Sequence, residues 1–583
     1  MVRRRELSDS RVLYYFVKIP LTFTGVLIAV VAVSLVSGGF VIYANHVAVA
    51  LASTPILVLV VRALVILTTC APIAYLLYKV PLGLLKGLVS TLFAFFTVYA
   101  IAAAELYLVV VLCAAGITLA ATQYRARRQR AQYSIKPTVF KPYLLLIPLL
   151  IAYATLSTYA LKASSEQVEL VELREPIEVS ADQHLVPLLT AYTYAADKLQ
   201  VPTHSIRLED VYVYFSNSRS VYSWIIEPSG FWNQVTKTPM GFVMVYGDVY
   251  PPRVETILKN TTWGLRNMKF YGLFFDSLYR QVVLRVGLHY KPLLESSVKI
   301  VHNGELLVLI PVVKWERGLV HSAPLLHGYV AVHEDGSLEF ISAESALRDP
   351  RFQGLPVVPW ILAREWAKLR EHSISIPGFY SHRSVYVVRD VGAEQPYLLV
   401  GTSNKTWWVF VAEPQGEPNT TKYLVYVDPS SLKPVLYVYT LPTPVVSAGR
   451  AVELIKQHYS LLDWNRLVIE GLAPIFVNNT LYWRAVVTTR DYRELVFVAL
   501  VNAETGAVTA VDVSKLSVEL RGNLTAKEVL ELLIRAVRGE VSEATIEERI
   551  KYLEELIQQL KATLDQLERE LEELKRQVGR KQN

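Results

Sequence analysis

The sequence predicts a multi-pass α-helical membrane domain, followed by an α+β extracytoplasmic region of repeated helix-plus-hairpin units and a C-terminal coiled coil. Three observations lead to this fold class. Between residues 19 and 122, only Arg62, Lys79, Lys86 and Glu105 carry a full charge. After residue 163 the chain has ordinary soluble patterning with recurring turn signals. Near its end, apolar residues recur in the heptad pattern of a coiled coil.

The apolar block is expected to form five spans, because one helical span needs about 20 apolar residues. These spans are predicted near 20–44, 48–78, 87–104, 105–122 and 143–161, which makes 1–163 the membrane domain. The count between 87 and 122 stays open, because "TVYAIAAAELYLVV" contains no Gly or Pro turn signal.

Charge bias predicts the orientation of these spans. Residues 1–163 hold 15 Lys/Arg and 3 Asp/Glu, a net of +12, so the total of +7 leaves −5 for the rest of the chain. With five spans, every basic loop falls on one side, including the island of Arg125, Arg127, Arg128 and Arg130. The positive-inside rule makes that side the cytoplasm and places the N-terminus there. The basic residues therefore report topology and do not indicate nucleic-acid binding.

Glycosylation signals agree with an extracellular location for the region after residue 163. That region carries five N-x-Thr sequons, none occurs before it, and chance gives roughly two. The sequons are at Asn260, Asn404, Asn419, Asn478 and Asn523. We therefore expect a cell-membrane glycoprotein whose large C-terminal region is extracellular.

No residue pattern points to an enzyme or a cofactor. Both cysteines, Cys70 and Cys113, precede residue 164, so the region after it can have neither a disulfide nor a thiolate metal site. The spacing of His321, His327 and His333 admits a metal site, but exposed or core histidines are favoured. No catalytic residue, metal or cofactor is predicted. The scarcity of thermolabile residues is typical of a thermophile.

Recurring units organise the region after residue 163. Hairpin patterns begin at Gly328, Lys422 and Glu494, each with an acidic or amide turn, and a helix pattern follows each one. Ser447 and Thr525 are the expected caps of the last two helices. The predicted domains are a mixed α/β domain over 164–270, an α+β domain over 271–445 and an α+β module over 446–540.

The best of these units, Val446 to Val513, combines the helix "AVELIKQHY", the strand "LYWRAVVTT" and the hairpin "VFVALVNAETGAVTAV". This order resembles the PepSY module of bacterial and archaeal extracytoplasmic proteins. Residues 355–440 resemble a looser second copy, and a third before Ser342 is left open. The resemblance implies a small α+β fold used in regulatory or protein-binding regions. It supplies no catalytic residue. An archaeal source is also expected.

The final segment, 541–583, is predicted to be a coiled coil that joins copies of the chain. Its two apolar heptad positions alternate by four and three residues, a stripe narrower than a helix needs to pack on its own domain. These positions are Ile546, Ile550, Leu553, Ile557, Leu560, Leu564, Leu567, Leu571, Leu574 and Val578. The alternative is an amphipathic helix packed on its own chain.

Two charges inside the apolar block, Arg62 and Glu105, are the last candidates. A charge at membrane depth suggests a function by default, although a structural pair or a hairpin tip is favoured. The predicted function is a membrane-anchored cell-surface interaction or scaffold protein that self-associates. Its expected partners are the lipid bilayer, itself and other cell-surface proteins. The alternative is a channel or transporter with a large outer domain.

Overall fold

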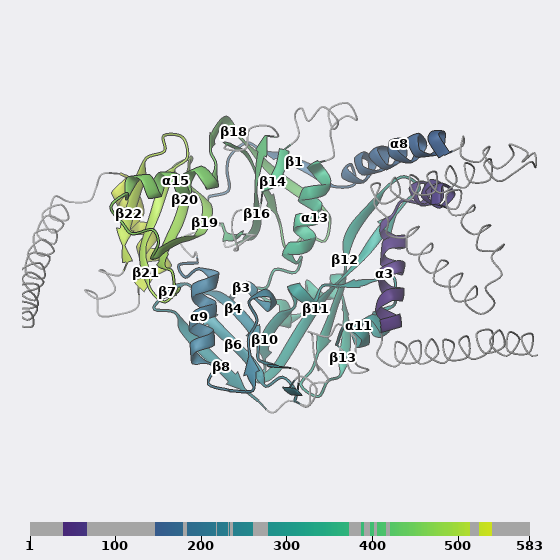
Figure 1. Ribbon diagram of the computed structural model, residues 1–583, viewed down its shortest axis with the longest axis horizontal. Coiled ribbons are helices and arrows are strands. Elements are labelled where there is room, and N and C mark those ends of the chain that lie inside the picture. Colours follow the sequence, from purple (N-terminus) through teal and green to yellow (C-terminus); the bar gives the residue numbers. More distant parts are fainter. Residues whose placement is uncertain are drawn as a thin grey trace, which may run out of the picture.

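The structure is a computed structural model of the 583-residue chain. It describes residues 39–66, 146–178, 184–216, 219–230, 232–233, 237–259, 278–371, 386–389, 397–401, 405–414, 420–513 and 524–538. Within them, four successive units share one plan, in which a helix is followed by an antiparallel meander of strands (Figure 1).

Units 1 and 2 have the same strand order and the same close contact between their last two long strands. Unit 1 contains α9 (Leu188–Lys198), β3 (Tyr212–Ser216), β4 (Arg219–Ile225), β6 (Gly241–Tyr246) and β8 (Arg253–Leu258), and its strand order is β3-β4-β6-β8. Unit 2 contains α11 (Leu278–Val286), β10 (Val298–His302), β11 (Glu305–Arg317), β12 (Ser322–Val332) and β13 (Leu338–Ser342), in the order β10-β11-β12-β13. A Cβ on Gly241 would lie 1.9 Å from the Ile257 carbonyl oxygen, and one on Gly328 would lie 2.2 Å from that of Ile341. Both positions therefore require glycine.

Units 3 and 4 follow the same plan. Unit 3 contains α13 (Trp360–Glu371), β14 (Tyr386–Arg389), β15 (Tyr397–Val400), β16 (Thr406–Pro414), β17 (Thr420–Val427) and β18 (Val435–Val446), and β14 and β15 both pair with β16. Unit 4 contains α15 (Ala448–His458), β19 (Leu467–Val477), β20 (Thr480–Thr489), β21 (Leu495–Asn502) and β22 (Val508–Asp512). The hairpins predicted from Gly328, Lys422 and Glu494 are the last hairpins of units 2, 3 and 4.

Short elements surround the four units. They are β1 (Glu169–Leu173), β2 (His204–Ser205), η3 (Leu208–Asp210), β5 (Glu227–Pro228), β7 (Val249–Tyr250), β9 (Lys291–Pro292), η5 (Leu294–Ser296), α12 (Ala343–Ala346), η6 (Pro350–Phe352) and β23 (Leu524–Thr525). Among them, β1 extends the sheet of unit 3 by pairing in parallel with β18.

Local sequence explains where the helices after units 3 and 4 begin. The Ser447 hydroxyl accepts a hydrogen bond from the Arg450 amide at the start of α15. At the start of α17 (Ala526–Val537), Thr525 and Glu528 form a reciprocal capping box. Both predicted caps are confirmed.

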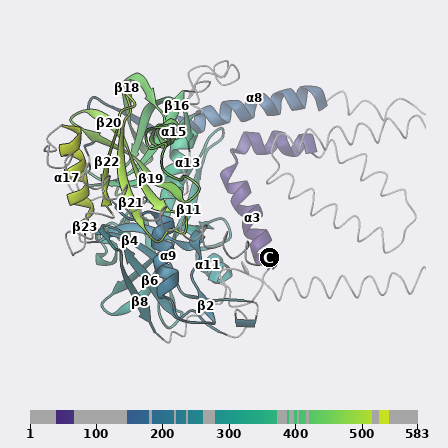
Figure 2. The same cartoon turned by 60° about the vertical axis from the view of Figure 1, so that its left-hand side comes forward.

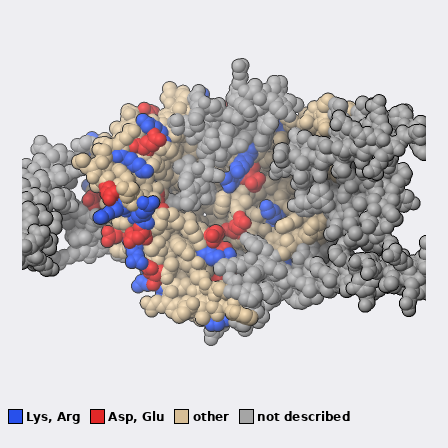
Figure 3. All heavy atoms as spheres, in the orientation of Figure 1, with Lys and Arg blue, Asp and Glu red and all other residues tan. Residues whose placement is uncertain are grey.

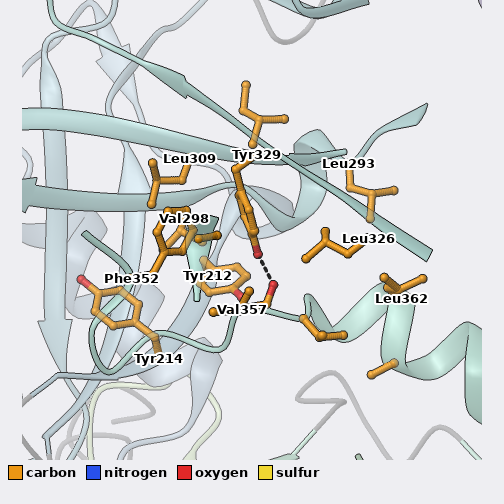
Figure 4. Close-up of a cluster of buried hydrophobic side chains, with 14 of the residues drawn as sticks. Tyr212, Tyr214, Leu293, Val298, Leu309, Leu326, Tyr329, Phe352, Val357 and Leu362 are labelled. Atoms are coloured by element: carbon orange, nitrogen blue, oxygen red, sulfur yellow. Dashed lines mark hydrogen bonds between the residues drawn. The ribbon is translucent and has the colours of Figure 1, made fainter. Parts of the chain in front are cut away.

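The four units pack in a cycle. One buried cluster contains Tyr212 of unit 1, Leu309 of unit 2 and Phe410 of unit 3, and Figure 4 shows its centre, where Tyr329 donates to the Val357 carbonyl. A second cluster joins the sheets of units 3 and 4. A third joins unit 4 and α17 to unit 1.

The closing contact of this cycle joins segments far apart in sequence. β7 pairs with β23, so the start of α17 lies beside unit 1. Nearby, the Leu495 amide of unit 4 donates to the Tyr250 hydroxyl over 3.1 Å. Arg493 also forms an ion pair with Asp197 of α9 at 3.3 Å. Because unit 4 touches both unit 3 and unit 1, each unit stabilises its neighbours.

The predicted multi-pass membrane domain is wrong, and so are the membrane and transmembrane assignments. Strands account for 40% of the described residues and helices for 33%. No single helix in the described ranges is long and apolar enough to cross a membrane. One pair bent by 118°, Val41–Ser53 and Ile56–Ile66, passes the length and composition test only when taken together. The predicted spans 87–104 and 105–122, and the parts of the others before 39, over 67–78 and before 146, lie outside the described residues.

The bend has a local cause that the apolar pattern hides. α3 (Gly39–Ser53) ends where the hydroxyls of Ser53 and Thr54 donate to the Ala50 carbonyl, over 3.1 and 2.8 Å. Pro55 follows, and proline has no N–H to continue the helical ladder. The next helical residues are bonded instead to the β11–β12 hairpin, because the Leu57 amide donates to the Leu319 carbonyl over 2.9 Å.

The apolar residues of the N-terminal region therefore pack partly on protein. Val41 and Ile42 of α3 contact the cluster shared by units 1, 2 and 3. α8 (Leu146–Ser165) packs against α13 and β12. Figure 2 shows α3 and α8 on one side of the four units, with α17 on the opposite side.

Candidate functional site

A cavity of about 710 Å³ lies where the N-terminal helices meet units 2 and 3. Its walls come from the bent helix pair, from α8, from the β9 and β11–β12 region, and from α13. The volume is within the range of roughly 300–1,000 Å³ that is usual for small-molecule sites.

The β11–β12 hairpin fixes the geometry of this cavity. Its tip is bonded to both helical walls, because the Arg317 guanidinium donates to the Leu51 carbonyl over 2.8 Å and the Ser322 amide donates to the Ser164 hydroxyl over 2.8 Å. On the remaining side, the indole N–H of Trp366 in α13 donates to the Pro324 carbonyl over 2.7 Å. The walls are therefore joined to one another by hydrogen bonds as well as by apolar packing.

Polar groups gather on one side of the cavity. The Nε of Arg62 donates to the Tyr153 hydroxyl over 3.0 Å, and its guanidinium lies 5.6 Å from the centre of the Tyr153 ring. Tyr153 is only 2% exposed. Ser157 lies one helical turn further along α8, and its buried hydroxyl has no hydrogen-bond partner among the described residues. Three polar side chains from two helices thus face the same space.

Charges of both signs contribute to the lining. Arg62 and Lys291 are cationic, and Glu365 of α13 is the acidic residue among the described lining residues. The described lining therefore carries one more positive than negative charge. Apolar side chains make up most of the remaining wall, including Val58, Ala160, Leu293, Ile361 and Leu362.

A second polar cluster is buried between units 1 and 2. The Arg207 Nε donates to Glu227 over 3.0 Å and lies 3.2 Å from an Asp210 carboxylate oxygen. Lys299 is fully buried and donates to the Asp210 backbone carbonyl. Burial lowers the pKa of Lys299 to about 8, although the charges of Asp210 and Glu227 oppose that shift. Two cations and two carboxylates balance there, which suits a structural junction better than a ligand site.

On the outer surface, charges alternate in sign. Figure 3 shows Lys and Arg beside Asp and Glu where units 4 and 1 lie in Figure 1. The described part of this face shows no broad field of one sign, which is what an extended polyanion would need.

The predicted site residues are separated by the fold. Arg62 contacts Tyr153 of α8, while its predicted partner Glu105 lies outside the described residues. Asn478 is exposed at the β19–β20 turn with a φ of 50°. The other four sequons, at Asn260, Asn404, Asn419 and Asn523, and the coiled coil over 541–583 also lie outside the described residues.

The three histidines at intervals of six have separate environments. His333 bridges Glu305 and Glu339 at 2.9 and 3.2 Å. His327 stacks on Tyr290 with a centroid distance of 4.1 Å, and His321 lies beside Gly318 at the tip of the β11–β12 hairpin. Within the described residues, no group of three His, Cys, Asp or Glu side chains is arranged to hold a metal ion.

Sequence reasoning found Arg62 but missed the rest of the cavity. Tyr153 and Ser157 stand four residues apart within the predicted span 143–161, and this spacing is the one local signal that they share a helix face. The contributions of β11, β12 and α13 carried no local signal, because they depend on pairings between distant segments. Trp407 and Trp408 are both buried and belong to two different clusters.

No family model, no curated protein and no solved structure matches this chain. The resemblance of 446–513 to the PepSY module therefore remains a prediction from the residue pattern.

Proposed function

We propose that this chain is a non-enzymatic interaction protein, in which the four units form a rigid scaffold and a C-terminal coiled coil joins copies of the chain. The observation that supports the scaffold is the cyclic packing of the units, in which unit 4 contacts both unit 3 and unit 1. A cycle of shared cores resists the opening of any one unit. Neither binding to a partner protein nor self-association depends on the predicted membrane domain, which the structure contradicts.

Hydrogen bonds from buried indoles support rigidity at the junctions. Trp366 bonds the backbone of unit 2 from unit 3, and Trp483 of unit 4 bonds the Val446 carbonyl of unit 3 over 2.7 Å. Both indoles are fully buried. A buried N–H aimed at one particular carbonyl fixes orientation as well as contact, because leaving it unpaired costs about 1–3 kcal/mol.

Self-association is tested at the coiled-coil seam. Changing Leu560 and Leu567 together to Asp places two charges where apolar side chains are expected to meet. The change also removes the burial of two Leu side chains, each of which contributes about 1.5–3 kcal/mol. We expect the mass of the full chain, measured by light scattering, to fall to that of the monomer. The control changes Gln559 and Gln566 to Asp, which adds the same charges outside the seam and should leave the mass unchanged. An unchanged mass in the seam variant would place assembly elsewhere.

We further propose that the sequon-bearing region lies outside the cytoplasm. The excess of N-x-Thr sequons over chance supports this location. Asn478 is exposed at the β19–β20 turn, where a modifying enzyme can reach its side chain. In protein purified from its native source, a peptide containing Asn478 should carry added glycan mass, and Thr480→Ala should abolish it. If Asn478 is unmodified on fully exported protein, it is not a glycosylation site. If the C-terminal region stays intact when whole cells are treated with protease, it does not lie outside the cytoplasm.

A further inference from the structure

The cavity between the N-terminal helices and α13 has an elongated outline. From Pro55 to Arg62 the helical residues span about 10 Å, and from Tyr153 to Ser164 α8 spans about 16 Å, at 1.5 Å per residue. Both segments line the cavity. Ser164 lies at the hairpin end, where it bonds Ser322, and Tyr153 lies at the other end, where it bonds Arg62. The cavity therefore extends from one end at the β11–β12 hairpin to another end at Arg62 and Tyr153.

The wall between the two ends favours an alkyl chain. Val58, Ala160 and Leu362 are at most 4% exposed, and Ile361 and Leu369 add a stripe from α13. Transfer of an alkyl chain from water to such a surface is favourable in proportion to the area buried. A ligand that was polar throughout would lose hydration here without finding enough hydrogen-bond partners.

The Arg62–Tyr153 end favours an anionic head group. Tyr153 accepts a hydrogen bond from Arg62, so its own O–H proton remains available to donate, and no described residue accepts it. The buried Ser157 hydroxyl, on the same face of α8, likewise has no hydrogen-bond partner within the part of the chain that the structure describes. A carboxylate accepts several hydrogen bonds and donates none. It would satisfy both hydroxyls and complement the charge of Arg62.

We propose that this cavity binds a single-chain aliphatic carboxylate, with its head group at Arg62, Tyr153 and Ser157 and its chain along Val58, Ala160 and α13. This inference is independent of the scaffold proposal, because self-association does not require a ligand. The proposed small-molecule site is the cavity where the N-terminal helices pack on units 2 and 3.

Calorimetric titration of the full chain tests this assignment with three ligands that share one chain length. Decanoate is expected to bind, decanol to bind at least about tenfold more weakly, and decyltrimethylammonium to bind more weakly still. Arg62→Gln and Tyr153→Phe should each weaken decanoate binding by about tenfold, a difference of about 1.4 kcal/mol. Arg285→Gln, an exposed change on α11 outside the cavity, is the matched control and should have no effect.

A gain-of-affinity variant separates binding from folding. Glu365→Gln removes the carboxylate from the described lining and should tighten decanoate binding several-fold, which a misfolded protein cannot do. Ala160→Phe, which fills the middle of the cavity, should abolish binding. Equal affinity for decanoate and decanol would overturn the assignment of the head group. Decanoate binding that is absent, or that is unchanged in Ala160→Phe, would overturn the site.

Discussion

Replacing Trp366 with Ala is expected to lower the free energy of unfolding by about 3–5 kcal/mol, the usual cost of truncating a buried Trp. Trp366 is fully buried in α13, and its indole N–H donates to the Pro324 carbonyl of β12. The change would leave a cavity between units 2 and 3 and an unpaired carbonyl. Denaturant unfolding monitored by circular dichroism measures the loss.

Two further variants separate packing from hydrogen bonding at this position. Trp366→Phe keeps most of the ring but removes the N–H, so it should cost about 1–3 kcal/mol. Trp232→Ala removes an indole that is 75% exposed, and it should change stability by less than about 0.5 kcal/mol. If Trp366→Ala costs no more than Trp232→Ala, α13 does not hold units 2 and 3 together.

Acid is expected to destabilise the native state through His184. This imidazole packs on Phe215 and Tyr222, with ring centroids 5.0 and 5.5 Å away, and its buried Nδ1 has no hydrogen-bond partner among the described residues. Burial, and to a smaller extent the charge of Arg484, lowers the pKa of His184 to about 3. The native state therefore keeps His184 neutral at a pH where the unfolded chain protonates it.

The direction of the pH dependence follows from proton binding. Below pH 6.5 the unfolded state binds one more proton than the native state, so stability falls as the pH drops from 6.5 towards 3. Between pH 7 and pH 4 this group should remove about 3 kcal/mol. Guanidinium unfolding at pH 7 and pH 4 measures this effect. The free energy of unfolding should fall by about 3 kcal/mol less in His184→Phe than in the natural protein.

A packing control completes this test. Phe215→Leu, which weakens the contact with the His184 ring without removing the imidazole, should lower stability by similar amounts at pH 7 and pH 4. If His184→Phe loses as much stability on acidification as the natural protein, the protonation of His184 does not contribute.

The local elements followed from the sequence because their causes are local. Ser447 and Thr525 begin helices through bonds to amides three residues away, and the turn at Asn502 closes because its side chain accepts from the amides of Glu504 and Thr505. The alternation of apolar and polar residues along a strand is also a local property. Hairpins and the helices that follow them could therefore be predicted from short stretches of residues.

The membrane domain failed because hydropathy does not identify the partner of an apolar side chain. α3 and α8 are apolar enough to suggest spans, yet Val41 packs on the shared core and Asn45 of α3 is fully buried. The Asn45 amide donates to the carbonyls of Leu288 and Tyr290 over 2.7 and 2.9 Å. Those acceptors lie more than 240 residues away in the chain, so no window of sequence around α3 could reveal them.

The sequence by itself determined the caps, the turns, the hairpins and the helices between them, because each depends on contacts within a few residues. Only the tertiary structure decided that these pieces form four units in a cycle and that Arg62 meets Tyr153. It also decided that the Ile56–Ile66 helix, α8 and α13 enclose a cavity beside the β11–β12 hairpin. Those outcomes depend on pairings such as β7 with β23, whose free energy arises from surfaces that become neighbours only when the whole chain folds.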